Sequence, residues 1–443
     1  MNPHSRNRHR ISPYPANSFY WQYKGRPLLL LGGSVEDNLF QIDDLEKHLD
    51  LLASVGGNYV RCTMSSRDPG DVWPFAQDPA TGLYDLAQPG EAYWRRFSRF
   101  VELTDQRDIV MQIEVWDRFD FAREPWNDNP FNPKNNRNYS ADESGLKERI
   151  DTHPGQREND FFHSVPALQN NQTVLRYQQA FVERLLEQTL GHGHILYCMD
   201  NETNDDPEWG WYWARFIRER AEAAGVEVQL TEMWDAWDLS SPQHANTIDH
   251  PEIFSFVDFS QNNHQQSETH YLNFQAQRQR IIDSGHIRPI NIVKTYGANA
   301  GRHGTSRNGQ ESFWRHLLGG AASVRFHRPP SGHGLDAIAQ ANIRSARMLT
   351  DRIDIFSSRP ANDLLEGRSR NEAFCLAQSG ETYALYFTDG GDLWLKSDTD
   401  LTVEWLHIHE SRWLEPQRLT AEAGRVHLVT PEYTGYWGAL LRP

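Results

Sequence analysis

The segment HILYCMDNETN, His194–Asn204, consists of a short apolar run, HILYCM, followed at once by a polar tail. An amphipathic stretch precedes it, in which Val174, Tyr177, Phe181 and Leu185 recur at helical spacing. We interpret the apolar run as a buried strand that follows a helix. Amphipathic stretches and short apolar runs also alternate before and after this segment. This alternation is typical of repeated strand and helix units around a parallel sheet.

Seven other short apolar runs resemble this one. With it, the predicted strands are Leu28–Leu31, Asn58–Cys62, Ile109–Val115, His194–Met199, Val226–Leu230, Phe254–Phe259, Pro289–Val293 and Ala321–Phe326. Eight such strands with intervening helices predict an α/β protein built on a (β/α)8, or TIM, barrel. An open doubly wound sheet is the alternative, but LGGS at Leu31–Ser34 lacks the glycine pattern that binds nucleotide phosphates.

Two regions depart from this rhythm. The segment Phe119–Asn170 is rich in Asn, Asp and Pro, and a loop of that length is usually functional or mobile. After Pro360, short strands separated by turns predict a small antiparallel β-sandwich, which we expect to pack on the barrel rather than to bind carbohydrate independently. The predicted domains are an N-terminal extension (1–20), a barrel (21–355) and a C-terminal β-sandwich (356–443).

Composition limits the partners. The chain has 443 residues and a formal net charge of −16, which argues against a general nucleic-acid binder because binding phosphates needs a basic face. Its three cysteines form no CxxC pair, so no disulfide framework or structural zinc site is expected. No apolar run is long enough to span a membrane, and Met1–Asn17 lacks the apolar core of a signal peptide. We therefore expect a cytoplasmic protein, or a periplasmic or secreted one if a leader preceded Met1; the oligomeric state is not predicted.

In a barrel of this kind the reactive groups follow the C-terminal ends of the strands. The candidates there, in strand order, are Asp37; Arg61; Glu114, Trp116 and Asp117; Asn201 and Glu202; Glu232 and Trp234; Asn263 and His264; Lys294 and Tyr296; and Arg325, His327 and Arg328. Carboxylates beside tryptophans and amides suit glycoside hydrolysis, which needs a protonated acid, an ionised partner and aromatic faces for sugar rings. The alternative is that these groups only form ion pairs at the barrel rim.

A catalytic metal or a cofactor is not expected. The sequence contains no HExxH and no DxDxDG motif, and no GxSxG turn that would start a serine triad. His192 and His194 lie at the N-terminal side of the fourth strand, where residues serve stability, and we interpret them as structural.

The segment YCMDNETN, Tyr197–Asn204, resembles the signature of the large clan of retaining glycosidases built on (β/α)8 barrels. This resemblance implies that Asn201 holds the sugar 2-hydroxyl and that Glu202 is the acid/base. The segments IEVWDRFDF (Ile113–Phe121) and NPFNP (Asn129–Pro133), with the C-terminal β module, also resemble apiosidase-like barrels that carry a collagen-binding-like domain.

The chain departs from that clan at the seventh strand. The clan has a Glu nucleophile there, whereas NIVKTYG, Asn291–Gly297, supplies Lys294 or Tyr296, and lysine cannot form a glycosyl ester. We therefore predict that the second carboxylate is Glu232, Glu114 or Asp117. An inverting reaction would place the two carboxyl groups about 6.5–9.5 Å apart, and a retaining reaction about 5–5.5 Å apart.

Lys294, Arg325, His327 and Arg328 predict a positively charged corner, which would suit an acidic substrate such as a uronic or sulfated glycan. Alternatively, Lys294 pairs with Glu202 or Glu232 and lowers its pKa.

Three functions remain open. The first is a glycoside hydrolase that acts on a poly- or oligosaccharide with Glu202 as general acid. The second is a polysaccharide lyase that uses Tyr296, Lys294 or His327 as base, and the third is a non-catalytic carbohydrate-binding barrel.

Overall fold

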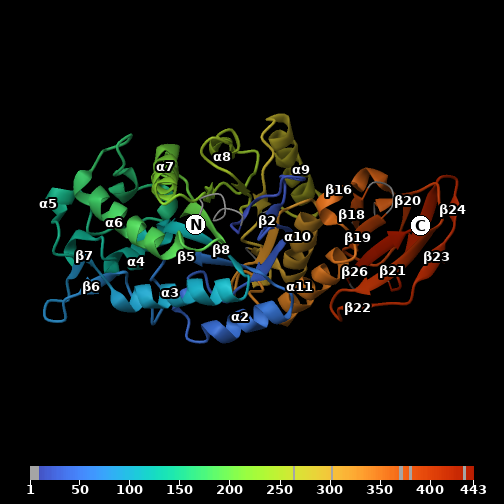
Figure 1. The fold of residues 1–443 in the computed structure, drawn as a ribbon, viewed down its shortest axis with the longest axis horizontal. Helices are drawn as coiled ribbons and strands as arrows, with labels where there is room; N and C mark the ends of the chain where they lie inside the picture. Colours follow the sequence, from blue (N-terminus) through green and yellow to red (C-terminus); the bar gives the residue numbers. More distant parts are fainter. Residues whose placement is uncertain (1–8, 263–264, 301–302, 369–372, 379–381, 433–435) are drawn as a thin grey trace.

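The computed structural model describes residues 9–262, 265–300, 303–368, 373–378, 382–432 and 436–443. The molecule is elongated, with the C-terminal strands at one end of its long axis and the segment around α5 (Ala141–Ser144) at the other (Figure 1). Parallel strands and their helices lie between these two ends.

Eight parallel strands form the centre. They are β4 (Leu30–Gly33), β5 (Tyr59–Thr63), β8 (Val110–Asp117), β9 (Ile195–Asn201), β10 (Gln229–Thr231), β11 (Val257–Asp258), β12 (Ile290–Asn291) and β15 (Ser323–Phe326). Six of them form one sheet in the order β10-β9-β8-β5-β4-β15, and β11 pairs with β12. Backbone hydrogen bonds from Ser255 N to Leu230 O (3.0 Å) and from Arg325 N to Ile292 O (3.0 Å) join the two groups into a ring. The predicted α/β fold with a parallel central sheet is confirmed, and the ring is TIM-barrel-like.

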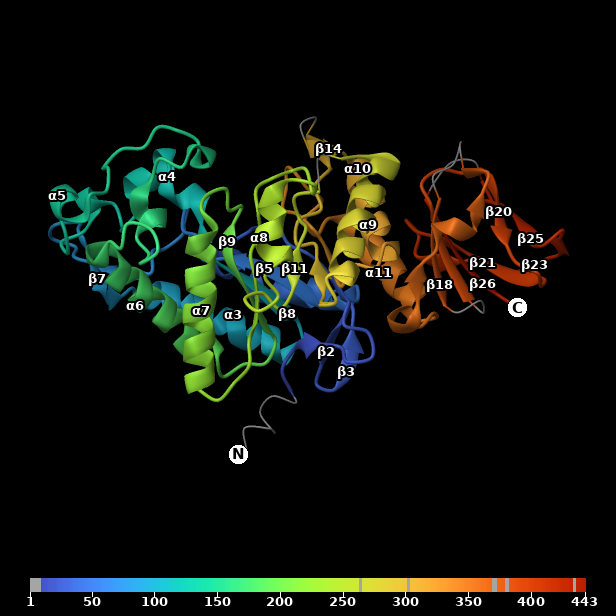
Figure 2. The same cartoon turned by 90° about the horizontal axis from the view of Figure 1, so that it is seen from above.

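The first strand differs from its prediction. Leu28 ends β3 (Arg26–Leu28), which pairs with β2 (Trp21–Tyr23) and through it with β1 (Ser12–Pro13), and the parallel strand begins only at Leu30. This small antiparallel sheet covers the N-terminal end of the ring, on the opposite side of the molecule from β14 (Gly304–Thr305) (Figure 2). Trp21 is fully buried there and donates its indole hydrogen to Asn291 Oδ1 at 2.9 Å. The domain boundary at residues 20/21 falls inside this sheet and stays a prediction.

Helices surround the ring. The long ones are α2 (Leu45–Ser54), α3 (Glu91–Gln106), α6 (Gln172–Thr189), α7 (Pro207–Ala223), α9 (Ser267–Asp283), α10 (Ser306–Leu318) and α11 (Ala337–Thr350). In α3, Tyr93, Phe97 and Phe100 recur on one face and are buried against the ring, as their spacing predicts. Asp336 starts α11 by accepting hydrogen bonds from the amides of Ile338 and Ala339.

The segment 119–170 is a packed structure built from α4 (Arg123–Asp128), α5 and short turns. Phe121, Phe131 and Phe161 form its aromatic core, with a stacked Phe121–Phe161 pair at 4.1 Å. Its asparagines hold the turns: buried Asn132, for example, donates to the carbonyls of Trp126 and Glu148. The asparagine-rich composition therefore marks ordered turns. A hairpin of β6 (Phe75–Gln77) and β7 (Tyr84–Pro89), which we did not predict, lies nearby.

The C-terminal part contains two antiparallel sheets, as predicted for a β-rich module. One is built from β16 (Arg359–Pro360), β18 (Ala373–Gln378), β19 (Thr382–Phe387), β26 (Trp437–Arg442), β21 (Leu401–His407), β22 (Arg412–Trp413) and β23 (Gln417–Leu419), and the other from β17 (Leu365–Glu366), β20 (Asp392–Lys396), β25 (Arg425–Val429) and β24 (Ala421–Glu422). They share an apolar core. The other face of the larger sheet packs on the barrel helices, where Tyr386 stacks on Trp314.

None of the helices in the described ranges has the length and apolar composition needed to cross a membrane.

Candidate active site

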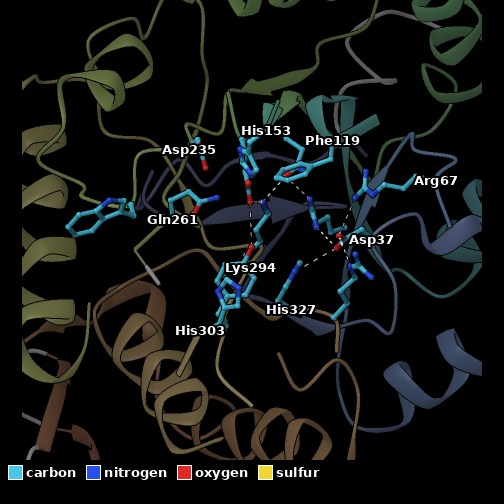
Figure 3. Close-up of a pocket in the computed structure, with 15 residues that line it drawn as sticks. Asp37, Arg67, Phe119, His153, Asp235, Gln261, Lys294, His303 and His327 are labelled. Carbon is cyan, nitrogen blue, oxygen red and sulfur yellow. Dashed lines mark hydrogen bonds and ion pairs between the residues drawn. The ribbon is translucent and has the colours of Figure 1, made fainter. Parts of the chain in front are cut away.

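A pocket of about 560 Å³ opens at the C-terminal ends of the parallel strands. It is lined by Asp37, Arg61, Arg67, Phe119, His153, Asn201, Glu202, Asp235, Trp237, Gln261, Lys294, Tyr296, His303, His327 and Arg328. In the view of Figure 3, Asp235 and Gln261 lie on one side of Lys294, and Asp37 and Arg67 lie on the other. The pocket therefore spans the ring from the first strand to the fifth and sixth.

Glu202 follows the last residue of β9 and has a left-handed backbone with φ of 64°. Such a conformation is unfavourable for a residue with a side chain and is concentrated at functional sites. The Glu202 carboxylate forms an ion pair with the ammonium of Lys294, and Tyr296 Oη lies 3.5 Å from Oε1. Burial by itself would raise the pKa of Glu202, but the Lys294 charge and the hydrogen bonds from Lys294 and Gln261 together outweigh it, so the pKa is lowered. Glu202 is therefore ionised.

Asp235 lies next to Glu202 at the end of the neighbouring strand. Its backbone N–H donates to Thr203 O at 2.8 Å, which ties the loop after β10 to the loop after β9. Burial and then the charge of Glu202 raise the pKa of Asp235 to about 6. The two neighbouring carboxyl groups thus have pKa values shifted in opposite directions.

Asp37 lies on the far side of the pocket in a cluster of cations. It pairs with Arg61 and, at 2.9 Å, with Arg328 Nε, while His327 Nδ1 lies 3.7 Å away. Burial opposes ionisation, but Arg61, His327 and Arg328 together hold the pKa of Asp37 well below its usual value. Asp37 is an ionised group whose charge its neighbours already balance.

The amide of Asn201 contacts protein groups on both sides. Its Oδ1 accepts from Arg61 Nη2 at 2.8 Å and from Lys294 Nζ at 2.6 Å, and its Nδ2 donates to Asp117 Oδ1 at 3.0 Å. Asn201 therefore links the Glu202–Lys294 pair to the Asp37–Arg61 pair across the floor of the pocket.

The predicted site residues fall into three groups. Those that line the pocket are Asp37, Arg61, Asn201, Glu202, Lys294, Tyr296, His327 and Arg328. Those that are buried outside it are Glu114, Trp116, Asp117, Glu232, Trp234 and Arg325. Asn263 and His264 lie outside the described residues.

The three carboxylates predicted as the second catalytic group do not line the pocket. Glu114 is fully buried against Arg61, and burial raises its pKa to about 7. Asp117 accepts from Arg67 and from Asn201. Glu232 points towards α7 and lies so close to it that a Cβ added at Gly210 would overlap Glu232 Oε2. The other carboxylate oxygen, Oε1, accepts a hydrogen bond from Thr203 Oγ1. Long-range partners hold each of these side chains outside the pocket.

The predicted tryptophans and Arg325 do not line the pocket either. Trp116 packs against Trp209 and Trp213, and Trp234 donates to Thr247 Oγ1, so neither ring faces the pocket. Arg325 is buried and donates to Ser34 Oγ and to Val293 O. The cations that do line the pocket are paired: Lys294 with Glu202, Arg328 with Asp37 and Glu36, Arg61 with Asp37 and Glu114, and Arg67 with Asp117 and Asp120. The Lys294–Glu202 pair is the alternative that the sequence left open.

Some lining residues were not among the candidates: Arg67, Phe119, His153, Asp235, Trp237, Gln261 and His303. Asp235 and Gln261 do follow the fifth and sixth strands, so their positions carried a signal. The others come from loops, and no local pattern distinguishes them. His153, for example, reaches the pocket from the 119–170 segment and packs edge-to-face on Phe119 at 5.6 Å.

Comparison with known proteins gives similarity of structure only. No protein-family model and no curated protein matches the sequence. One solved structure described as "Glycoside hydrolase" is similar over 100% of this chain and 98% of its own, with a TM-score of 0.65 and 10% identity. A glycoside hydrolase family 5 protein from Bacteroides vulgatus ATCC 8482 has a TM-score of 0.64 and 11% identity, covering 98% of this chain and 94% of its own.

A second protein from the same organism, described as a putative glycoside hydrolase, has a TM-score of 0.62 and 11% identity over 99% of this chain and 83% of its own. The similarity includes the C-terminal β module as well as the ring, because it covers nearly the whole chain in each case. The chain therefore shares the complete two-part fold of these solved glycoside hydrolases.

Proposed function

We propose that the protein hydrolyses a glycosidic bond in a poly- or oligosaccharide, with Asp235 as proton donor and Glu202 as its ionised partner. The shared fold supports this proposal, since all three similar structures are described as glycoside hydrolases. The observation that carries it is the pair of neighbouring carboxyl groups in one pocket: within the described ranges, Glu202 forms an ion pair with Lys294 and Asp235 forms none.

The electrostatic surroundings suggest which group is the acid. Two carboxyl groups that act as acid and as base or nucleophile need environments that push their pKa values apart. Lys294 holds Glu202 ionised, and burial beside that charge favours the protonated form of Asp235. This assignment reverses the role predicted for Glu202 from the resemblance, in which Glu202 was the general acid.

The reaction then follows from these states. Asp235 donates its proton to the oxygen of the leaving sugar, and the Glu202 carboxylate either attacks the anomeric carbon or removes a proton from a water that attacks it. Lys294 keeps Glu202 charged before the reaction. A lysine at the end of the seventh strand thus supports a carboxylate on the fourth strand instead of acting as a nucleophile.

The pocket also offers surfaces that suit sugars. Trp237, which is 53% exposed, and Phe119 both line the pocket, so aromatic faces are available for sugar rings. Gln261 adds an amide for hydroxyl groups. Because the pocket cations are already paired with carboxylates, we favour a neutral glycan over the acidic one that the sequence suggested. The apiosidase-like resemblance stays a prediction.

The alternatives have less support. A lyase needs a base that loses its proton readily, but burial and the Glu202 charge raise the pKa of Tyr296 well above its usual value. Lys294 is held by Glu202 and Asn201. A non-catalytic barrel would not require oppositely shifted carboxyl groups.

The test is a screen of the purified protein on neutral and acidic glycans, with product stereochemistry followed by NMR. We expect reducing sugar from at least one neutral glycan, no product with Glu202→Gln, and a rate lowered about 10²-fold or more with Asp235→Asn. Unsaturated products that absorb ultraviolet light would favour the lyase instead. Binding without any product would favour the non-catalytic barrel.

A further inference from the structure

A second cluster of chemically reactive side chains lies at the opposite end of the barrel from the pocket. It consists of Asp105, in the last turn of α3, and of His192 and His194, in the turn that leads into β9. Glu202 follows the other end of β9, so the cluster and the pocket are separated by the length of that strand. The inference below does not depend on the proposed function.

The three side chains point towards one another. His192 Nδ1 lies 2.8 Å from Asp105 Oδ2, and His194 Nδ1 lies 3.7 Å from Asp105 Oδ1. One ligand atom from each residue can be chosen so that all three lie within 4.8 Å of one another. Two imidazoles and a carboxylate are ligands that zinc commonly uses.

The hydrogen bonds of Thr104 fix which nitrogen of His194 carries the proton. Thr104 Oγ1 lies 2.8 Å from Phe100 O and 3.0 Å from Val101 O, and its one hydrogen is directed to these carbonyls. Its oxygen therefore accepts from His194 Nε2, which lies 3.0 Å away. In the neutral ring, Nδ1 then carries a lone pair.

That lone pair is buried and points into the cluster. His194 is fully buried, and its Nδ1 makes no hydrogen bond within the described part of the chain. It faces Asp105 Oδ1, which is also an acceptor, so the two groups have no hydrogen to share. A cation between them would satisfy both, and a zinc ion with bonds of about 2.0–2.2 Å fits between atoms this far apart.

A comparable cluster elsewhere lacks this feature. His163 lies near Asp205 and Asp206, but its two ring nitrogens lie 3.0 Å from Asp160 Oδ1 and from Asp205 Oδ2. Both of its nitrogens are thus used as donors to carboxylates. The unsatisfied lone pair distinguishes the Asp105 cluster.

We propose that Asp105, His192 and His194 bind a zinc ion, with water completing the coordination. The Thr104 hydroxyl orients His194 as an outer-shell partner. Entry is open, because the side chains of His192 and Asp105 are 28% and 38% exposed. Lys24, a nearby cation, already pairs with Asp108. The ion would tie the end of α3 to the start of β9, a structural role at the stability end of the barrel. This departs from our expectation that the chain contains no metal site.

The test is a calorimetric titration of the full chain, without a polyhistidine tag and after treatment with a chelator, with Zn²⁺. We expect one Zn²⁺ per chain and a higher melting temperature once it is bound. His192→Ala should weaken Zn²⁺ binding about tenfold or more, since it removes one of three ligands. The substitution should leave the fold intact because His192 is at the surface, and circular dichroism checks this.

His250→Ala is the matched control. His250 also pairs with a carboxylate, Glu252, at 2.9 Å, but belongs to no group of three possible metal ligands among the described residues. This variant should bind Zn²⁺ as the original chain does. Co²⁺ gives a second readout, since the visible absorption of the bound ion should disappear in His192→Ala and persist in His250→Ala. Failure of the chain to take up one equivalent of Zn²⁺, or equal affinity in His192→Ala, would overturn the proposal.

Discussion

Glu202 and Asp235 lie at the ends of adjacent strands, yet their environments differ because, among the described residues, Glu202 forms an ion pair and Asp235 forms none. Lys294 reaches Glu202 from the end of the seventh strand and forms an ion pair with it. The pKa of Asp235 is raised instead, by burial and by the negative charge of Glu202. At the scale of single residues, the position of one lysine therefore divides two similar carboxyl groups into one with a lowered pKa and one with a raised pKa.

Replacing the proton donor tests this division. Asp235→Asn should lower kcat/KM about 10²–10⁴-fold, the usual contribution of general acid catalysis. Because the pKa of Asp235 is raised to about 6, the activity of the original enzyme should fall as the pH rises through 6. The residual activity of the variant should lack this basic limb. Asp238→Asn, on the same loop but outside the pocket, is the control and should keep the limb.

Removing the lysine tests the ion pair. The pKa of Glu202 in the folded protein lies below its ordinary value of 4.5, so the pair stabilises the fold above that pH and loses its effect as the pH falls through the lowered pKa. Lys294→Met should cost about 3–5 kcal/mol near neutral pH, because it leaves a buried charge unpaired. Urea denaturation at several pH values measures this loss, which should shrink in acid.

Two variants serve as references for Lys294→Met. Lys24→Met removes an exposed lysine from its pair with Asp108, and should change stability little. Adding Glu202→Gln to Lys294→Met should recover part of the lost stability. If the single and double variants were equally unstable, the ion pair would not be the cause.

At the scale of elements, the segment 119–170 shows how a long stretch with only short helices and turns can hold a site residue in place. Asparagine side chains replace the missing backbone hydrogen bonds, and phenylalanines supply the core. The same segment carries Phe119 and His153 to the pocket. The ordered packing of this segment therefore positions two residues that line the pocket.

Asn132→Ala should loosen this segment. Asn132 is buried and bonds to two backbone carbonyls, which would lose a donor at a cost of about 1–3 kcal/mol each when left unsatisfied. We expect faster cleavage by protease within residues 119–170 and a higher KM, with a smaller change in kcat. Asn127→Ala, at an exposed position in the same segment, should show neither effect.

At the scale of the whole molecule, the barrel and the C-terminal sheets form one body. Phe374, Tyr386, Leu406 and Leu440 of the sheets belong to the same apolar cluster as the barrel helices. The rings of Trp314 and Tyr386 stack with centroids 5.3 Å apart and planes 8° apart. Because the two parts bury apolar side chains against each other, we expect them to unfold together rather than as independent domains.

Tyr386→Ala should therefore lower the stability of the whole chain by about 3–5 kcal/mol. Calorimetry should still show one transition, at a lower temperature. Tyr386→Phe is the matched control: the Tyr386 hydroxyl is buried and makes no hydrogen bond to any described residue, so losing it should leave stability unchanged or higher. Two separate transitions in the original protein would contradict a single cooperative body.

The sequence by itself determined the order of strands and helices and the end of the barrel at which polar groups gather. These features depend on local periodicity and on which residues follow each strand, so Glu202, Lys294 and Asp37 could be identified as candidates. The start of the first strand was misplaced by two residues, because Leu28 and Leu30 are both apolar although they belong to different sheets.

Only the tertiary structure decided the directions and partners of the side chains. Lys294 and Glu202 are 92 residues apart. Glu114 and Asp117 lie in β8 and Glu232 follows β10, but long-range contacts hold all three side chains outside the pocket. Ion pairing and burial are properties of neighbours in space, and they set the pKa values on which the chemistry depends. The same reason explains why His194, which the sequence marks only as structural, acquires a buried lone pair once Thr104 and Asp105 lie beside it.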